Sequence, residues 1–196
     1  MKKLSTYLFL IFFSFQTPSW ADDISDFEIE GMSIGDSLLD YFSKKEIKDN
    51  TNTNYYTNNT YTSVSFNKLP VFEIYESVEF NYKTDDKKYI IAAIVGGLFC
   101  EENIEKCNKK QKEIDLELSN VFKNAKRVDD KGKHGADKSG KSTFKHISFW
   151  LISGDVAGIE LVNWSEEITN ENRWVDNVKV TFHRKEFNDF LGIAFK

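Results

Sequence analysis

The feature that most constrains the fold is a nearly continuous apolar stretch, KYIIAAIVGG, at residues 88–97. A strand with apolar side chains on both faces requires neighbouring strands on each side and a cover over each face. The preceding segment, residues 72–82, instead alternates between apolar and polar side chains, as a half-buried strand does. A polar turn, KTDDK, separates the two segments. Together they predict an antiparallel sheet with a buried central strand.

Strand-like and helical patterns continue on both sides of this pair. Ser33 is a favourable N-cap and precedes apolar residues at helical spacing, which predicts a helix over residues 34–48. Similar spacing predicts a long amphipathic helix over residues 103–126. A tight turn at Gly154-Asp155 predicts a hairpin. Further strands are predicted at residues 61–66, 143–152, 156–164 and 178–182. Polar loops are predicted at 49–62, at 127–142 and before the last strand. The chain is predicted to end in a short helix or docked tail at 186–195.

This order of elements predicts an α+β protein. One or more antiparallel sheets carry helices packed on one face, in the order α-βββ-α-βββ-tail. The same order is compatible with two α-β-β-β units, although the two halves show no convincing sequence repeat. We expect residues 22–196 to form a single α+β domain, with possible halves at 27–98 and 99–196. A chain of this length buries about 70% of its unfolded surface, so its fold does not depend on additional crosslinks or bound metals.

The first residues have the pattern of a secretory signal peptide. Lys2 and Lys3 precede the apolar segment 4–15, and Ser19-Trp20-Ala21 forms a small–x–small cleavage signature. The apolar segment is too short to span a bilayer as a helix. We therefore expect residues 1–21 to be removed and the mature chain to be periplasmic or secreted. No later segment approaches 18 or so uninterrupted apolar residues, so we do not expect the mature chain to span a membrane. The alternative is an uncleaved N-terminal anchor.

The chain has two cysteines, Cys100 and Cys107. In an exported chain, one pair with none left over predicts a disulfide. Seven residues of continuous helix would separate the two Cα atoms by about 10 Å, which is too far for the bond. Cys100 is therefore expected before the helix begins. Metal ligation or a redox pair is the alternative, but no histidine or further cysteine lies nearby and the spacing is not C-x-x-C. We assign no metal ligands.

The charge balance excludes several partners. The formal net charge is −5, and loss of Lys2 and Lys3 makes it more negative. Nucleic acids and anionic membrane surfaces require a basic face. We therefore expect no nucleic-acid partner.

One segment matches a nucleotide-binding motif. Residues Gly135–Ser142, GADKSGKS, fit G-x-x-x-x-G-K-[ST]. That loop works by joining a buried strand to a helix N-terminus, where backbone N–H groups meet the phosphates. Here a polar segment precedes Gly135, and a strand-like alternation follows Ser142. We therefore expect no nucleotide and no cofactor.

The same loop carries Asp130, His134 and Asp137, which are candidate ligands for a hard metal ion, but the adjacent lysines favour a solvated loop. His146 and His183 lie far from any recognisable nucleophile arrangement in sequence, although a catalytic triad assembled in space is compatible with any spacing. Several Asp and Glu residues are neighbours in the sequence, which is expected of an acidic protein and does not by itself indicate a catalytic carboxylate pair. We assign no catalytic residues.

Six aromatic residues are candidates for a binding surface. Tryptophan in paired strands is usually part of the core, and the alternative is an exposed aromatic patch that marks a partner or ligand surface. These residues are Trp150, Trp164, Trp174, Tyr55, Tyr56 and Tyr61.

The segment IEGMSIGDSLLDYF, residues 29–42, resembles a segment of uncharacterised, signal-peptide-bearing proteins of AT-rich marine alphaproteobacteria. It is more distantly similar to the small α/β envelope module of the outer-membrane assembly lipoprotein BamE and of β-lactamase-inhibitor proteins. In that module a Gly-Met-Ser/Thr turn opens a helix under antiparallel strands. The first resemblance implies no known activity, and the second implies protein–protein binding without catalysis. No cysteine follows the expected cleavage site, so the lipid anchor of the lipoprotein is not implied.

The sequence therefore favours an exported, non-catalytic module of the cell envelope that binds a protein or a small ligand at residues the sequence does not identify. One alternative is an exported hydrolase whose site is assembled from dispersed histidines and acids. A histidine within hydrogen-bond reach of an acid in a pocket would favour the hydrolase, and an exposed Trp/Tyr sheet face would favour the binding module. A scaffold component of a larger envelope complex is a third possibility.

Overall fold

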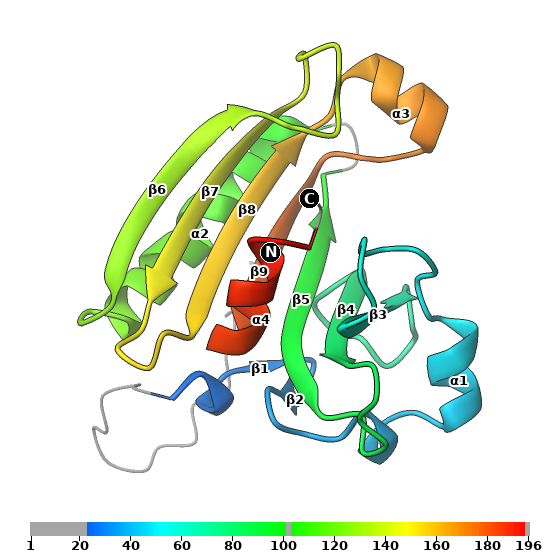
Figure 1. The fold of residues 1–196 in the computed structure, drawn as a ribbon. Helices are drawn as coiled ribbons and strands as arrows, with labels where there is room; N and C mark the ends of the chain where they lie inside the picture. Colours follow the sequence, from blue (N-terminus) through cyan, green and yellow to red (C-terminus); the bar gives the residue numbers. More distant parts are fainter. Residues whose placement is uncertain (1–22, 101–102, 195–196) are drawn as a thin grey trace, which may run out of the picture.

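A computed structural model describes residues 23–100 and 103–194 of the 196-residue chain (Figure 1). The signal peptide expected at residues 1–21 lies outside the described residues. Short 3-10 turns occur at Ile24–Asp26 and Leu38–Asp40. The helices are α1 (Lys44–Asp49), α2 (Ile104–Val121), α3 (Glu166–Asn172) and α4 (Lys185–Leu191). The strands are β1 (Glu28–Ile29), β2 (Met32–Ser33), β3 (Tyr61–Asn67), β4 (Ser77–Lys83), β5 (Ile91–Phe99), β6 (Lys126–Lys133), β7 (Thr143–Trp150), β8 (Val156–Asn163) and β9 (Asn177–His183).

The predicted fold class is confirmed, since the structure is α+β with an antiparallel sheet and helices. Strands β1 and β2 form a small hairpin, and the other seven form one antiparallel sheet in the order β3-β4-β5-β9-β8-β7-β6. The apolar stretch that includes β5 is an interior strand, as predicted, because β4 and β9 pair with it on its two sides.

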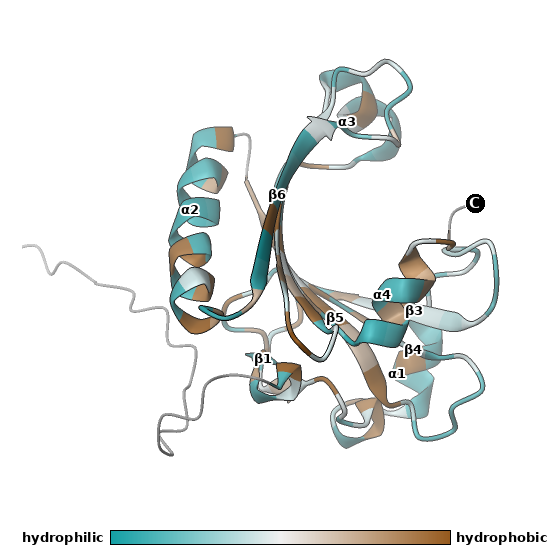
Figure 2. Ribbon diagram, turned by 60° about the vertical axis from the view of Figure 1, so that its left-hand side comes forward, coloured by the Kyte–Doolittle hydropathy of each residue, from teal (hydrophilic) through white to brown (hydrophobic). Residues whose placement is uncertain are grey.

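Helix α2 covers one face of this sheet, where it buries the main hydrophobic core. Ile114 and Leu118 of α2 belong to the same buried cluster as Ile94, Ile159 and Phe182, which point from the sheet toward the helix. The expectation that helices pack on one face holds for α2 but not for α4. Phe187 and Phe190 of α4 pack with Ala93, whose side chain lies on the opposite face. Figure 2 shows α2 and α4 on the two sides of the sheet.

Two segments predicted as loops are regular structure. Strand β6 begins at Lys126 and takes up the first half of the predicted loop 127–142, and α3 lies within the polar segment before the last strand. Every residue of β6 is exposed, and its sequence, KRVDDKGK, has no apolar alternation. Its pairing with β7 holds it in the sheet. The second half of the chain therefore has four strands, and the two halves are not matching α-β-β-β units.

The helix predicted over residues 34–48 is not continuous, and about half of its length is not helical. Only residues 38–40 and 44–49 are helical. Residues 35–38 bond instead to the chain at β5: Gly35 N–H donates to the Ile91 carbonyl, and Ile91 N–H donates to the Asp36 carbonyl, both at 2.9 Å. Gly35 also has a φ of 97°, which a helix does not allow. Tertiary hydrogen bonds thus override the helical spacing of the apolar residues.

The strand predicted at residues 72–82 begins only at Ser77. Glu30 explains the difference, because its carboxylate accepts hydrogen bonds from the backbone N–H groups of Glu73, Ile74 and Tyr75 at 2.6–2.8 Å. These N–H groups are therefore unavailable to a sheet partner. The alternation of apolar residues alone did not reveal this distant acceptor.

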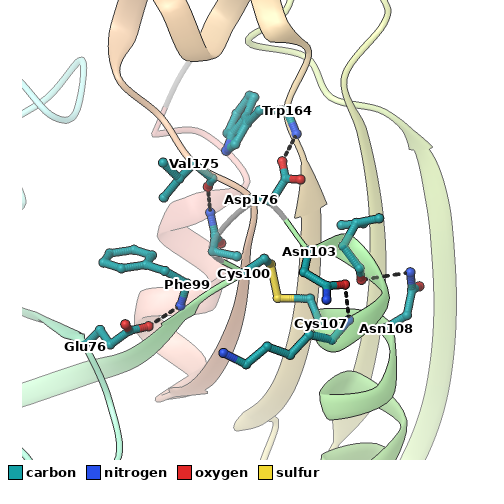
Figure 3. Close-up of a disulfide and its surroundings, with 12 residues drawn as sticks. Glu76, Phe99, Cys100, Asn103, Cys107, Asn108, Trp164, Val175 and Asp176 are labelled. Atoms are coloured by element: carbon teal, nitrogen blue, oxygen red, sulfur yellow. Dashed lines mark hydrogen bonds between the residues drawn. A yellow bond between two sulfur atoms is a disulfide. The ribbon is translucent and has the colours of Figure 1, made fainter.

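A disulfide joins Cys100 to Cys107, as predicted (Figure 3). Cys100 lies between β5 and α2, Cys107 lies in the first turns of α2, and the two Cα atoms are 5.6 Å apart. Cys100 N–H also donates to the Asp176 carbonyl at 2.9 Å, next to the start of β9. The bond thus fixes the start of α2 where β5 and β9 meet. Among the helices of residues 23–100 and 103–194, none is long and apolar enough to cross a membrane.

Replacement of both cysteines, Cys100→Ala with Cys107→Ala, is expected to lower the free energy of unfolding by roughly 2–3 kcal/mol, because the unfolded chain regains the entropy of a short loop. Urea denaturation measures the change. The wild-type protein under a reductant is the control for the lost crosslink without a lost side chain. A double variant that unfolds at the wild-type urea concentration would contradict a stabilising disulfide.

Candidate functional site

The face of the sheet opposite α2, here called the open face, carries a row of charged and ionisable side chains. Asp130 on β6, His146 on β7, Glu160 on β8 and Lys179 on β9 are successive cross-strand partners. Residues directly opposite each other in an antiparallel sheet point to the same side. The four residues, here called the charged row, therefore run across four strands.

His146 and Glu160 form the centre of the charged row. His146 Nδ1 lies 3.8 Å from Glu160 Oε2, and both side chains are half-buried. Burial would raise the pKa of Glu160, but the contact with His146 and the charge of Lys179 outweigh it, so this pKa lies below its usual range. Glu160 is therefore ionised at neutral pH, between two potential cations.

Gly158 makes room for the side chains beside this pair. A Cβ at Gly158 would lie 2.8 Å from Thr181 Oγ1 and 3.3 Å from His146 Cε1. Thr181 is the cross-strand neighbour of Gly158, so its hydroxyl and the His146 ring both approach the glycine on the open face. A larger residue at 158 would displace one of them.

The hydroxyls near His146 do not form a nucleophile arrangement in the described part of the chain. Ser148, two residues along β7, accepts a hydrogen bond from Trp150 Nε1 at 3.0 Å and donates to the Val128 carbonyl at 3.5 Å. No hydrogen bond among residues 23–100 and 103–194 joins a hydroxyl to His146. The geometry thus provides a histidine–acid pair and no activated serine or threonine.

The other two histidines of the chain also belong to this side of the sheet. The His183 ring packs against Phe187 with centroids 5.3 Å apart. Burial, together with the nearby His146, lowers the pKa of His183 to about 4. His134 packs against Trp164 at 4.3 Å, and burial lowers its pKa as well. His183 is therefore neutral at pH 7.

The aromatic candidates gather around the open face. Trp174, 43% exposed, packs on Trp164, just after the end of β8, with centroids 4.7 Å apart, to one side of the charged row. Trp150, 39% exposed, lies on the same face at the end of β7, on the other side of the charged row. Tyr55 is exposed and packs edge-on against Tyr56. The exception is Tyr61, which is buried in the small core under α4.

The segment that matches the nucleotide motif connects two strands. Residues Gly135–Ser142 lie between β6 and β7, and the expectation that a strand follows Ser142 is confirmed. Asp137 holds this loop in place, because its carboxylate accepts hydrogen bonds from the Ser139 and Ser142 N–H groups at 2.8 Å and from the Ser165 hydroxyl at 3.0 Å. The Ser142 hydroxyl donates to the same carboxylate at 2.6 Å. The loop is thus tied to the N-cap of α3.

The expectation of a solvated loop is wrong at Asp137, which is buried. Its carboxylate binds serines, so it does not join Asp130 and His134 as a set of metal ligands. Within residues 23–100 and 103–194, no three His, Cys, Asp or Glu side chains come close enough to hold a metal ion.

His146 was predicted to be isolated, and the charged row was not predicted. The predicted hairpin is present, but its register differs from the one that a two-residue turn at Gly154-Asp155 gives, which would place His146 opposite Asn163. The connection spans residues 151–155 and places Trp150 opposite Val156, and hence His146 opposite Glu160. Lys179 and Asp130 required two further facts, that β9 lies next to β8 and that β6 is a strand.

Asp137→Asn is expected to lower the melting temperature at pH 7. The hydrogen bonds from Ser142 and Ser139 hold the pKa of Asp137 well below its usual range. The stability that they provide is therefore present at neutral pH and declines progressively as the pH falls from about 4 toward the lowered pKa. Thermal unfolding at pH 7 and pH 3 measures this. Asp130→Asn, on exposed β6, is the control. A difference between wild type and Asp137→Asn that is equal at both pH values would contradict this account.

His183 is expected to titrate near pH 4 in the folded protein, whereas an unfolded-chain histidine protonates near 6.5. Between these values the unfolded state binds more protons, so stability should fall as the pH is lowered from about 6.5 to 4. An NMR titration of the imidazole Cε1–H signals measures the pKa, and His183→Gln assigns the signal. A His183 signal that titrates at pH 6 or above would show that the ring is not buried in this way.

A scan against protein-family models and searches of curated proteins and of solved structures found no match for this chain. The similarity of residues 29–42 to envelope modules therefore stays a prediction.

Proposed function

We propose that the chain is an exported, non-catalytic binding protein of the cell envelope, located in the periplasm, and that it binds a protein partner on the open face. The observation that carries the proposal is the charged row, which lies on the sheet face opposite α2 between exposed tryptophans. The disulfide between Cys100 and Cys107 fits an exported protein. The signal peptide predicted at residues 1–21 would direct the chain to export.

The chemistry of the open face favours a polypeptide partner. Asp130 and Glu160 alternate with His146 and Lys179 along the charged row, so a partner of mixed charge complements it better than a polyanion does. Exposed tryptophan and tyrosine are enriched at protein interfaces, where they bury large apolar areas. Trp174 and Trp150 lie on the two sides of the charged row and supply such anchors.

A hydrolase is the second candidate, and the contact between His146 and Glu160 at 3.8 Å is the observation that favours it. A general base still requires a nucleophile within hydrogen-bond reach. Ser148, the closest serine along β7, is bonded to Trp150 and to the Val128 carbonyl. The binding function therefore has the stronger support.

Site-specific photocrosslinking in the host cell tests the proposal. Benzoylphenylalanine placed at Trp174 or Trp150 is expected to form the same protein adduct. The matched control is benzoylphenylalanine at Leu116, which is 65% exposed on α2 and faces away from the sheet. Adducts from Leu116 as strong as those from Trp174, or no adduct from either tryptophan position, would contradict the proposal.

Charge reversal in the charged row tests its role separately. In the Trp174 crosslinking background, Lys179→Glu is expected to reduce the adduct at least fivefold, because it places a second acid beside Glu160. Asp130→Lys, at the exposed end of the row, is the second variant and keeps the test valid if Lys179→Glu does not fold. Adducts that both folded variants leave unchanged would contradict a role for the charged row.

A further inference from the structure

The polar segment before β3 folds back over that edge strand and borders a cavity that is open to solvent on one side. Asn52 N–H donates to the Ser63 carbonyl at 2.9 Å, and Ser65 N–H donates to the Asn50 carbonyl at 3.1 Å, so residues 50–52 pair along β3. The chain then leaves the strand and returns at Tyr61. The space between, about 170 Å³, is a cavity beside the sheet edge, on the opposite side of β4 and β5 from the charged row.

The lining of this cavity has an unusual composition. It consists only of asparagine, threonine, serine and tyrosine, in a chain of which 29% is charged. An ion would find no opposite charge there, and an apolar ligand would leave amides and hydroxyls unpaired. Amides and hydroxyls each donate and accept hydrogen bonds. The lining therefore matches a neutral ligand with many hydroxyl groups.

The aromatic wall of the cavity is held in place before any ligand binds. Tyr56 donates its hydroxyl hydrogen bond to Asn81 Oδ1 at 2.7 Å and packs edge-on against Phe190 at 4.9 Å. Tyr55 packs against Tyr56 and donates to Glu79 Oε2 at 3.3 Å. Rigid tyrosine rings supply contact area at a low entropic cost, and an aromatic ring beside polar groups suits the C–H face of a sugar ring.

Some polar side chains at the cavity are hydrogen-bonded to one another, and others make no hydrogen bond to the described residues. In the first group, Asn52 Nδ2 donates to Ser63 Oγ at 2.9 Å and to Ser65 Oγ at 2.7 Å. Asn54 and Asn59 are exposed, and neither side chain hydrogen-bonds to another residue in the described parts of the chain. Each amide offers a donor and an acceptor side by side, which is the geometry that pairs with two neighbouring hydroxyls.

We propose that this cavity is a binding site for one neutral monosaccharide unit, free or at the end of a glycan. The volume is below the range of about 300–1,000 Å³ typical of sites for drug-sized ligands, so it admits one ring. Asn54 and Asn59 hydrogen-bond the sugar hydroxyls, and the tyrosines contact its ring. This site is separate from the proposed protein partner on the charged row.

A ¹H–¹⁵N NMR titration with glucose, galactose, mannose and N-acetylglucosamine tests the proposal. At least one sugar is expected to cause saturable shifts at residues 51–63, with a Kd in the millimolar range that suits a few hydrogen bonds. Glucuronate is the charged control and is expected to shift these signals less. Failure of all four sugars to produce saturable shifts there, or equal shifts with glucuronate, would overturn the proposal.

Variants locate the site within the same titration. Asn54→Gly removes the amide and tolerates the φ of 57° at this position, and combined with Asn59→Ala it is expected to raise the Kd about tenfold or more. Asn124→Ala, exposed in the turn after α2, is the matched control and is expected to leave the Kd unchanged. Asp130→Lys is also expected to bind the sugar normally, which separates this site from the charged row. A double variant with the wild-type Kd would overturn the assignment.

Discussion

The pairing of β5 with β9 is the interaction on which the rest of the structure depends. It runs from Ala93 opposite His183 to Phe99 opposite Asn177, and it joins the strands β3-β4-β5 to the strands β9-β8-β7-β6. Because β5 also pairs with β4 and β9 also pairs with β8, this ladder turns two small sheets into one. The disulfide and the hydrogen bond from Cys100 to Asp176 secure the same place, where α2 leaves the sheet.

The two faces of the continuous sheet have different roles. Apolar residues such as Ile94 and Phe182 face α2 and form the main core. On the other face, α4 and Tyr56 cover the part over β3 to β5, and the charged row lies over β6 to β9. Because Gly158 has no side chain, it leaves space on this face for the side chains of His146 and Thr181. The registers across β5 and β9 thus fix the position of the charged row relative to the tyrosines.

The sequence predicted what local patterns determine and missed what distant contacts determine. Strands β3, β5, β7, β8 and β9, helix α2 and the disulfide followed from periodicity and cysteine spacing. Strand β6 was missed because all its side chains are exposed. The start of the helix predicted at residues 34–48 was wrong because the backbone of Gly35 and Asp36 bonds to Ile91. At the site, the predicted hairpin joins the strands of His146 and Glu160, but their pairing depends on the five-residue connection 151–155 and not on a two-residue turn. Lys179 and the tyrosines required the tertiary arrangement.

Native-state hydrogen exchange by NMR tests most directly whether one cooperative sheet carries this surface, and it also tests the prediction of a single domain over residues 22–196. Interior strands of one cooperative unit open only in global unfolding. The account therefore predicts that the slowest amides of β4 and β5 exchange with the same free energy as those of β8 and β9. Exchange of residues 61–98 at a clearly lower free energy than residues 143–183 would show two independent halves and contradict a continuous open face.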